Sequence, residues 1–264
     1  PQQHRTVALR FGLDPGAIAQ GHLACTLWLL GYPDQALARS EVALTLAREL
    51  DHPVTQAFAQ VVLIQLPFFL RDFAAVDAQA TMCNRLAAEY GLSHLLTLVV
   101  FYRGTVLVRR GQVAGGLADI ERSIKELAMG GEPLEPGLVE LAAAYGLAGQ
   151  PEAGLSVLEQ ATGRCTGMHL FDAEIHRLRG ELSEMQGAAP DEVETHYRQA
   201  IQVARQHEAR SWELRATISL ARLWQAQGKQ DEAYKMLAEI YHWFTEGFDT
   251  VDLKEAKVLL DSLI

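Results

Sequence analysis

The stretch GYPDQALARSEVALTLA (residues 31–47) decides the fold, because its pattern recurs along the chain. A glycine precedes a polar turn, a small residue follows five positions after the glycine, and another small residue follows seven positions later. The pattern returns in GQVAGGLADIERSI (111–124) and in GKQDEAYKMLAEI (228–240). Such internal recurrence is typical of repeat proteins.

When the chain is aligned on this pattern, the following residues form two series at intervals of 38 to 40 residues: Ala36, Val76, Gly116, Gly154, Val193 and Ala233, then Ala43, Cys83, Ser123, Ala161, Ala200 and Ile240. Residues seven apart share one face of a helix, and small ones there allow close helix packing. The turn before each helix carries Gly31, Arg71, Gly111, Gly149, Gly187 (offset by one residue) and Gly228. Glycine ends a helix at little cost. One such hairpin cannot bury its apolar face alone, so hairpins stack in series.

The absence of alternating β-branched runs around hairpin turns favours an all-α fold. We predict a right-handed superhelical solenoid of about six helical hairpins followed by a C-terminal capping helix. The expected boundaries are 1–13 for an upstream tail or linker, 14–248 for the array (14–52, 53–92, 93–131, 132–167, 168–208, 209–248) and 249–264 for the cap. An apolar stripe marks the cap, formed by Leu253, Ala256, Leu260 and Leu263.

The composition excludes some classes of function. The net charge of −10, from 23 basic and 33 acidic residues, disfavours a nucleic-acid surface and an anionic membrane surface. The apolar runs fall short of the ~18 residues that would span a bilayer. Three distant cysteines, Cys25, Cys83 and Cys165, indicate reduced thiols and a cytoplasmic location.

Catalytic signatures are also missing from the sequence. It has no GxxxxGK[ST] phosphate loop and no GxSxG nucleophile elbow, so we expect a non-catalytic chain without a cofactor. His169, Asp172 and His176 have helical i, i+3, i+7 spacing and types that bind zinc. A capped helix start with two exposed histidines explains them better, because a three-ligand zinc site usually needs a tighter cluster such as HExxH, and we predict no metal site.

The candidate binding residues are those expected to face the concave groove from the first helix of each hairpin. Early repeats supply Trp28, Phe68 and Phe101, and late repeats supply Arg177, Glu181, Glu184, Arg215 and Arg222. The arginines would clamp carboxylates or phosphates of a partner. Two structural alternatives stay open: the aromatic residues belong to the core, or the arginines pair with Glu181 and Glu184 and hold repeats together.

Several segments of the sequence resemble known families. They are FGLDPGAIA (11–19), LWLLGYPDQALARSE (27–41), AEIHRLRGEL (173–182), ELRATISLARLWQAQGK (213–229) and YHWFTEGFDTVDLKEAKVLL (241–260). The glycine-and-small-residue pattern resembles the tetratricopeptide repeat, with a period of about 40 in place of the usual ~34. These segments are similar to the C-terminal region of bacterial multidomain signalling proteins that join a cyclase, kinase or DNA-binding domain to a predicted ATPase.

This resemblance implies a scaffold or sensor module that binds a protein or peptide partner, or its own upstream ATPase domain, and regulates attached ATPase or cyclase domains. The alternative is an inducer-sensing domain that binds a small molecule at the aromatic end of the groove. Homo-oligomerisation is compatible with the first function.

Overall fold

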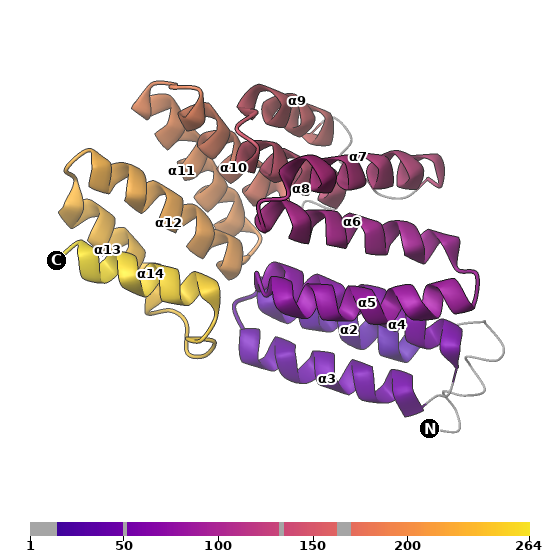
Figure 1. Cartoon of the computed structure of the whole chain (residues 1–264). Helices are drawn as coiled ribbons and strands as arrows, with labels where there is room; N and C mark the ends of the chain where they lie inside the picture. The colour runs from indigo at the N-terminus through magenta and orange to yellow at the C-terminus, as the bar shows by residue number, and fades with distance from the viewer. Residues whose placement is uncertain (1–14, 50–51, 132–134, 163–169) are drawn as a thin grey trace. The chain divides into compact units, whose positions relative to one another are not determined.

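The computed structural model describes residues 15–49, 52–131, 135–162 and 170–264, and the regular elements within these ranges are all α-helices. Thirteen helices follow one another in this part of the chain (Figure 1). Most helices that follow one another in the sequence also pack against each other. The all-α helical-repeat fold predicted from the sequence period is therefore confirmed.

The chain divides into two compact units, one comprising Pro1–Trp28 and Tyr32–Gly131, the other Glu132–Ile264 with Leu29–Gly31. The first unit contains the helices α2 (Pro15–Leu29), α3 (Pro33–Glu49), α4 (Pro53–Phe69), α5 (Phe73–Glu89), α6 (Ser93–Arg109) and α7 (Val113–Met129). The second contains α8 (Glu135–Leu147), α9 (Pro151–Thr162), α10 (Asp172–Met185), α11 (Pro190–Gln206), α12 (Arg210–Ala226), α13 (Gln230–Tyr241) and α14 (Val251–Ser262).

The turn inside each hairpin has the left-handed backbone conformation that the sequence pattern predicts. The φ angle is positive at all six predicted turn residues: Gly31 (92°), Arg71 (61°), Gly111 (82°), Gly149 (70°), Gly187 (80°) and Gly228 (77°). Glycine adopts this conformation without steric cost, whereas a side chain with a Cβ meets the following carbonyl oxygen. Arg71 therefore carries backbone strain that the five glycines avoid.

Replacing Arg71 with glycine is expected to raise the free energy of unfolding by roughly 0.5–1 kcal/mol, because relief of the left-handed strain exceeds the added flexibility of the unfolded chain. Arg71→Ala retains the Cβ and serves as the control. Denaturant unfolding of the full chain measures both variants. An equal gain from alanine would show that the arginine side chain, and not its backbone conformation, limits stability.

The small residues predicted at the packing positions are all buried. Both series, from Ala36 to Ala233 and from Ala43 to Ile240, lie on the buried faces of α3, α5, α7, α9, α11 and α13. They occupy the second helix of every hairpin, as expected from the pattern. Small side chains at these positions let the first helix of the hairpin approach closely.

A close approach of this kind joins α6 to α7. A Cβ atom added to Gly116 would lie 2.5 Å from the carbonyl oxygen of Gly104 and 2.8 Å from the backbone nitrogen of Val108. A Cβ added to Gly104 would lie 2.9 Å from the carbonyl oxygen of Gly116. The two helices therefore touch backbone to backbone, and neither position has room for a side chain.

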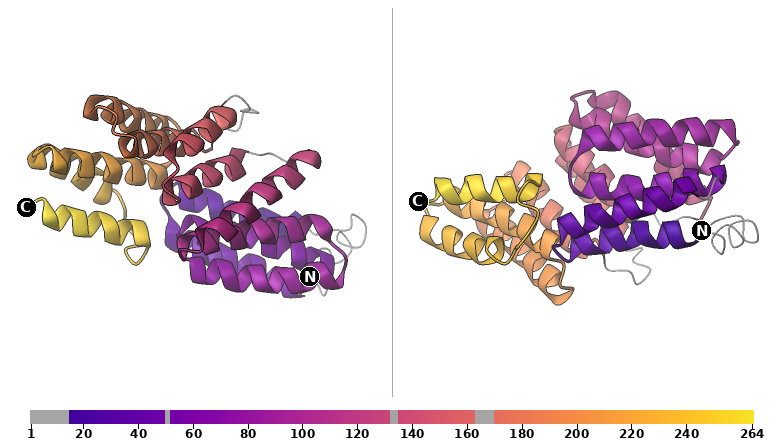
Figure 2. Two further views of the ribbon diagram at one scale, coloured as in Figure 1. Left: turned by 45° about the horizontal axis from the view of Figure 1, so that its top comes forward. Right: turned by 90° about the horizontal axis from the view of Figure 1, so that it is seen from below.

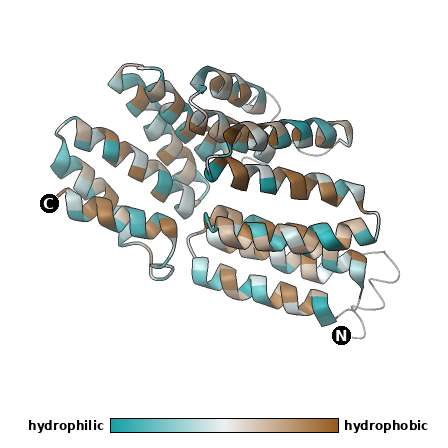
Figure 3. Ribbon diagram, viewed as in Figure 1, coloured by the Kyte–Doolittle hydropathy of each residue, from teal (hydrophilic) through white to brown (hydrophobic). Residues whose placement is uncertain are grey.

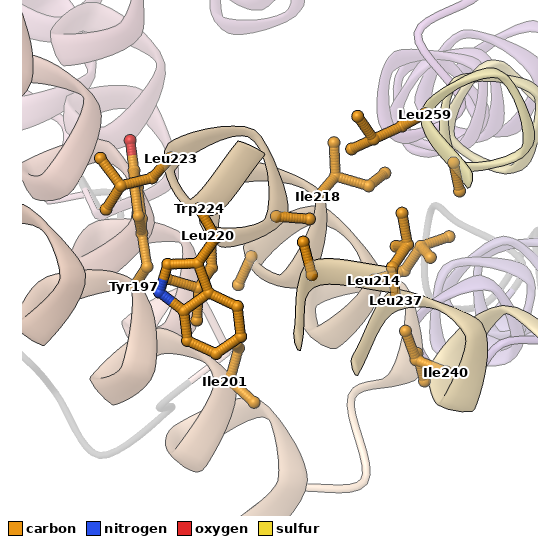
Figure 4. Packing of buried hydrophobic residues seen from close by; sticks show 14 of the residues in the cluster. Tyr197, Ile201, Leu214, Ile218, Leu220, Leu223, Trp224, Leu237, Ile240 and Leu259 are labelled. Carbon is orange, nitrogen blue, oxygen red and sulfur yellow. The ribbon is translucent and has the colours of Figure 1, made fainter. Parts of the chain in front are cut away.

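Each unit has an apolar core formed by the facing sides of its helices. In the first unit one core cluster joins Ala17 of α2, residues Ala43, Leu44 and Ala47 of α3, and residues Ala59 and Leu63 of α4. In the second unit a larger cluster extends from α11 to α14 and includes Tyr197, Leu214, Trp224, Leu237 and Leu259 (Figure 4). Individual helices carry both hydrophobic and hydrophilic segments, which matches their one-sided burial (Figure 3).

The last helix completes the second unit. Helix α14 packs on α12 and α13 and lies beside them in both views of Figure 2. The predicted apolar stripe of Leu253, Ala256, Leu260 and Leu263 is buried. Lys254, Lys257, Val258 and Asp261 are exposed on α14. This mostly charged outer surface suits a helix that ends a stack of repeats, and the capping role stays our proposal.

Candidate partner-binding surface

The aromatic candidates of the early repeats lie in or beside the core of the first unit. Trp28 of α2 is only 2% exposed and stacks on Phe69 of α4, with 4.8 Å between ring centroids. Phe101 of α6 is 7% exposed. Phe68 is half-buried and packs edge-on against Tyr102 at 5.7 Å. Burial therefore makes Trp28 and Phe101 packing residues in this structure, and Phe68 is the aromatic candidate that reaches the surface.

Arg177 of α10 is held by carboxylates of its own helix. Its guanidinium donates two hydrogen bonds of 2.7 Å to Glu174 and a further one to Glu181. Its side chain is only 14% exposed. Burial opposes the charge, but the adjacent carboxylates of Glu174 and Glu181 raise the pKa of Arg177 above its usual value. Arg177 is thus a fixed positive charge between two acids of its own helix, so its pairing with Glu181 does not itself join one repeat to the next.

Arg215 and Arg222 of α12 pair with the last helix. Arg215 donates to Asp252 through Nε at 2.9 Å and approaches it through Nη2 at 2.8 Å, and its guanidinium stacks over the Trp212 ring at 5.0 Å. Arg222 donates to Glu255 at 2.9 Å. The sequence did not indicate these partners, since it placed the arginines near Glu181 and Glu184.

These contacts form a polar seam across α10 and α12, the first helices of two successive hairpins, and the last helix α14. The seam consists of Arg177, Glu181 and Glu184 on α10, Arg215, Ser219, Arg222 and Gln225 on α12, and Asp252, Glu255 and Ser262 on α14. Ser219 donates to Glu181 at 3.4 Å, which links α10 to α12. Gln225 donates to Ser262 at 3.0 Å, which adds to the two arginine contacts between α12 and α14.

The seam is accessible at only part of its length. The side chain of Arg222 is 51% exposed and that of Glu181 is 40% exposed, whereas that of Arg215 is 14% exposed. Glu184 is exposed and accepts a hydrogen bond from the Tyr197 hydroxyl at 3.2 Å. Positively and negatively charged side chains are thus exposed on α10 and α12, whereas Arg177 and Arg215 are mostly buried.

A second set of charged residues, which sequence analysis missed, lies at the start of these helices. Four buried carboxylates stand at 39-residue intervals in the first turns of α8, α10, α12 and α14: Glu135, Glu174, Glu213 and Asp252. Glu174 and Asp252 bind Arg177 and Arg215. Glu213 is 2% exposed and accepts from Arg205 at 2.6 Å and Arg210 at 2.7 Å. Acidic groups suit helix N-termini, where the helix dipole is positive.

The constant 39-residue spacing was the sequence signal for this carboxylate ladder. A search for small residues does not reveal it, because a recurring acid resembles any exposed charge until its burial is known. The corresponding positions of the first unit hold apolar residues or threonine, such as Thr55 and Leu95. The ladder is therefore a feature of the second unit.

The other sequence candidates for chemistry receive no support in the described ranges. Among residues 15–49, 52–131, 135–162 and 170–264, no group of three or more His, Cys, Asp or Glu side chains is arranged to hold a metal ion. Burial raises the pKa of the Cys25 thiol to about 12 and that of Cys83 to about 11, so both thiols stay protonated near neutral pH. Cys165 and His169 lie outside the described residues, as do residues 1–13.

Comparison with known proteins supports a repeat of one particular type. A family model described as tetratricopeptide repeat matches residues 214–239, which cover most of α12 and α13 and the turn between them. No curated protein matches the chain. None of the described helices combines the length and apolar character needed to cross a membrane. The hairpin at the centre of the polar seam therefore belongs to a region of tetratricopeptide-repeat type.

Proposed function

We propose that the chain is a non-catalytic interaction module that binds a protein or peptide along the exposed part of the polar seam. The observation that supports this function is the combination of accessible charges on consecutive first helices, Glu181 and Glu184 on α10 and Arg222 on α12, in a region of tetratricopeptide-repeat type. Such repeats generally bind protein partners through extended surfaces of this kind.

The contacts within the seam indicate how it would recognise a partner. Arg177 and Arg215 are already satisfied by buried carboxylates, so they fix the positions of their neighbours. Arg222 and Glu255 form a solvent-exposed pair that a partner's carboxylate can compete for at little cost, since exposed pairs contribute only about 0–1 kcal/mol. Glu181 and Glu184 would bind a basic side chain of the same partner.

The resemblance to multidomain signalling proteins supports a further part of this proposal. Partner binding would regulate ATPase or cyclase domains attached to the chain, and an upstream ATPase domain would itself be a candidate partner. The small-molecule alternative is less well supported, because burial of Trp28 and Phe101 removes the aromatic pocket walls that it requires.

A displayed peptide library selected on the full chain tests the interaction function. Selected peptides are measured by calorimetry against the wild type and against the Glu181→Lys/Glu184→Lys variant. We expect binding to weaken at least about tenfold, because loss of two charge-assisted contacts costs more than about 1.4 kcal/mol. The Glu232→Lys/Glu239→Lys variant is the control, because it makes the same charge change on exposed positions of α13.

A pair of reversed charges tests the role of Arg222 separately. Arg222→Glu/Glu255→Arg preserves the ion pair between α12 and α14 but exchanges its two ends. Peptides that depend on Arg222 should lose affinity for this variant while its unfolding midpoint stays near that of the wild type. Equal affinity for all variants, or failure to select any peptide, would contradict binding along the seam.

A further inference from the structure

Two histidines outside the polar seam, one on each helix of a single hairpin, lie close enough to affect each other's charge. His176 is on α10 and His196 is on α11, and both side chains are partly buried. The Nδ1 atom of each ring is buried and has no hydrogen-bond partner. In a neutral imidazole with its proton on Nε2, such an Nδ1 atom is only an unused acceptor, which is the less costly arrangement.

The charges around this pair oppose protonation on balance. Burial lowers the pKa of His176, and Arg179 and His196 lower it further, while Asp172 acts in the opposite direction. Burial and Arg179 also lower the pKa of His196, against the effect of Glu192. Arg179 is held in place by a 2.7 Å hydrogen bond to the Thr162 hydroxyl of α9. The pair thus lies beside a fixed cation, with carboxylates contributed by α10 and α11.

We propose that His176 and His196 form an acid-sensitive switch in the α10–α11 hairpin, in which neutral imidazoles keep the two helices packed and protonation loosens them. Protonation places a hydrogen on each buried Nδ1, which has no hydrogen-bond acceptor within reach. It also creates two positive charges beside each other and beside Arg179. Both effects are relieved when the helices separate and water reaches the rings.

The direction of the pH dependence follows from linkage. A histidine whose pKa is lower in the folded state contributes stability that is fully present above the ordinary pKa of ~6.5. That contribution is lost as the pH falls through 6.5 toward the folded-state pKa, because the unfolded chain then binds more protons. The same hairpin carries Tyr197 and Glu184, whose hydrogen bond connects α11 to the polar seam. Acid would therefore loosen one end of the seam.

Thermal unfolding of the full chain tests the switch at about pH 7.5 and about pH 5.5, the range in which histidine ordinarily titrates. We expect the midpoint of the wild type to fall by roughly 2–4 °C more than that of His176→Gln/His196→Gln, which removes both titrating groups. His242→Gln, at an exposed histidine of the same unit, is the matched control and should behave as the wild type.

Proton NMR titration of the wild type provides a test that does not depend on how the double variant folds. His176 and His196 should titrate below the ordinary histidine midpoint, and Arg179→Gln should move both midpoints upward. Ordinary midpoints for both rings in the wild type, or the same acid-induced fall in the double variant as in the wild type, would overturn the proposal.

Discussion

Gly116→Ala is expected to lower the free energy of unfolding of the first unit by about 3 kcal/mol. The new Cβ would meet the carbonyl oxygen of Gly104 at 2.5 Å and the backbone nitrogen of Val108 at 2.8 Å. Backbone atoms cannot rotate away as a flexible side chain can. Helices α6 and α7 must therefore move apart, which weakens the packing of Ile120 and Val108 at this contact.

The adjacent residue provides the control for this prediction. Gly115 is exposed in the same helix, and a Cβ added there would meet nothing within 4 Å. Gly115→Ala should stabilise the chain by about 0.5–1 kcal/mol, because alanine is the better helix former. Chemical denaturation of both variants should show opposite signs at neighbouring positions. A loss of similar size at both would mean that helix propensity, and not the close approach of α6 and α7, determines the outcome.

Glu213→Ala is expected to cost about 3 kcal/mol in the second unit. The Glu213 carboxylate is 2% exposed and accepts hydrogen bonds from Arg205 of α11 and Arg210 of α12. Its removal would leave a cavity and deprive Arg205 and Arg210, whose side chains are 47% and 29% exposed, of their buried anion. Gln at the same position keeps the shape but not the charge, so Glu213→Gln should fall between alanine and the wild type.

Glu239 is the matched control, because it also approaches Arg205, at 3.9 Å, but its side chain is 76% exposed. Glu239→Ala should change the free energy of unfolding by less than about 0.5 kcal/mol, as is usual for exposed ion pairs. The comparison holds Arg205 constant, while the two carboxylates differ in burial and in their distance from it, 2.6 Å for Glu213 and 3.9 Å for Glu239. Similar losses for Glu213→Ala and Glu239→Ala would show that the buried carboxylate has no special role.

Much of the fold was predictable because it depends on local geometry. A glycine at a helix end and two small residues seven apart report a left-handed turn and a close helix contact, and both are properties of a short segment. Arg71 shows the strength of this signal, since the repeat placed a left-handed residue there although arginine disfavours that conformation. The apolar stripe of α14 was predictable for the same reason.

The candidate surface was less predictable because it depends on contacts between distant segments. Spacing places Arg215 and Arg222 on one side of α12, but it cannot show that α14 brings Asp252 and Glu255 to them. An apolar residue on the first helix of a hairpin can face either a groove or a neighbouring helix. Trp28 stacks on Phe69 of α4, and Phe101 is buried. The burial of Glu213 could not be predicted from the sequence, because its two cations, Arg205 and Arg210, come from different helices.

The 39-residue spacing of the carboxylate ladder also defines how many residues an inserted repeat must have to keep the acids and their cations in register. A tandem copy of residues 174–212, inserted after Trp212, would place the copied Glu174 three residues after Arg210, where Glu213 now stands. The copied Arg205 and Arg210 would in turn precede the original Glu213 at their present distances. Every acid downstream of the insertion would keep its cation, and the seam would gain one more step. Elongation by a whole repeat would thus keep the spacing between each buried acid and its cations, both in the laboratory and through gene duplication.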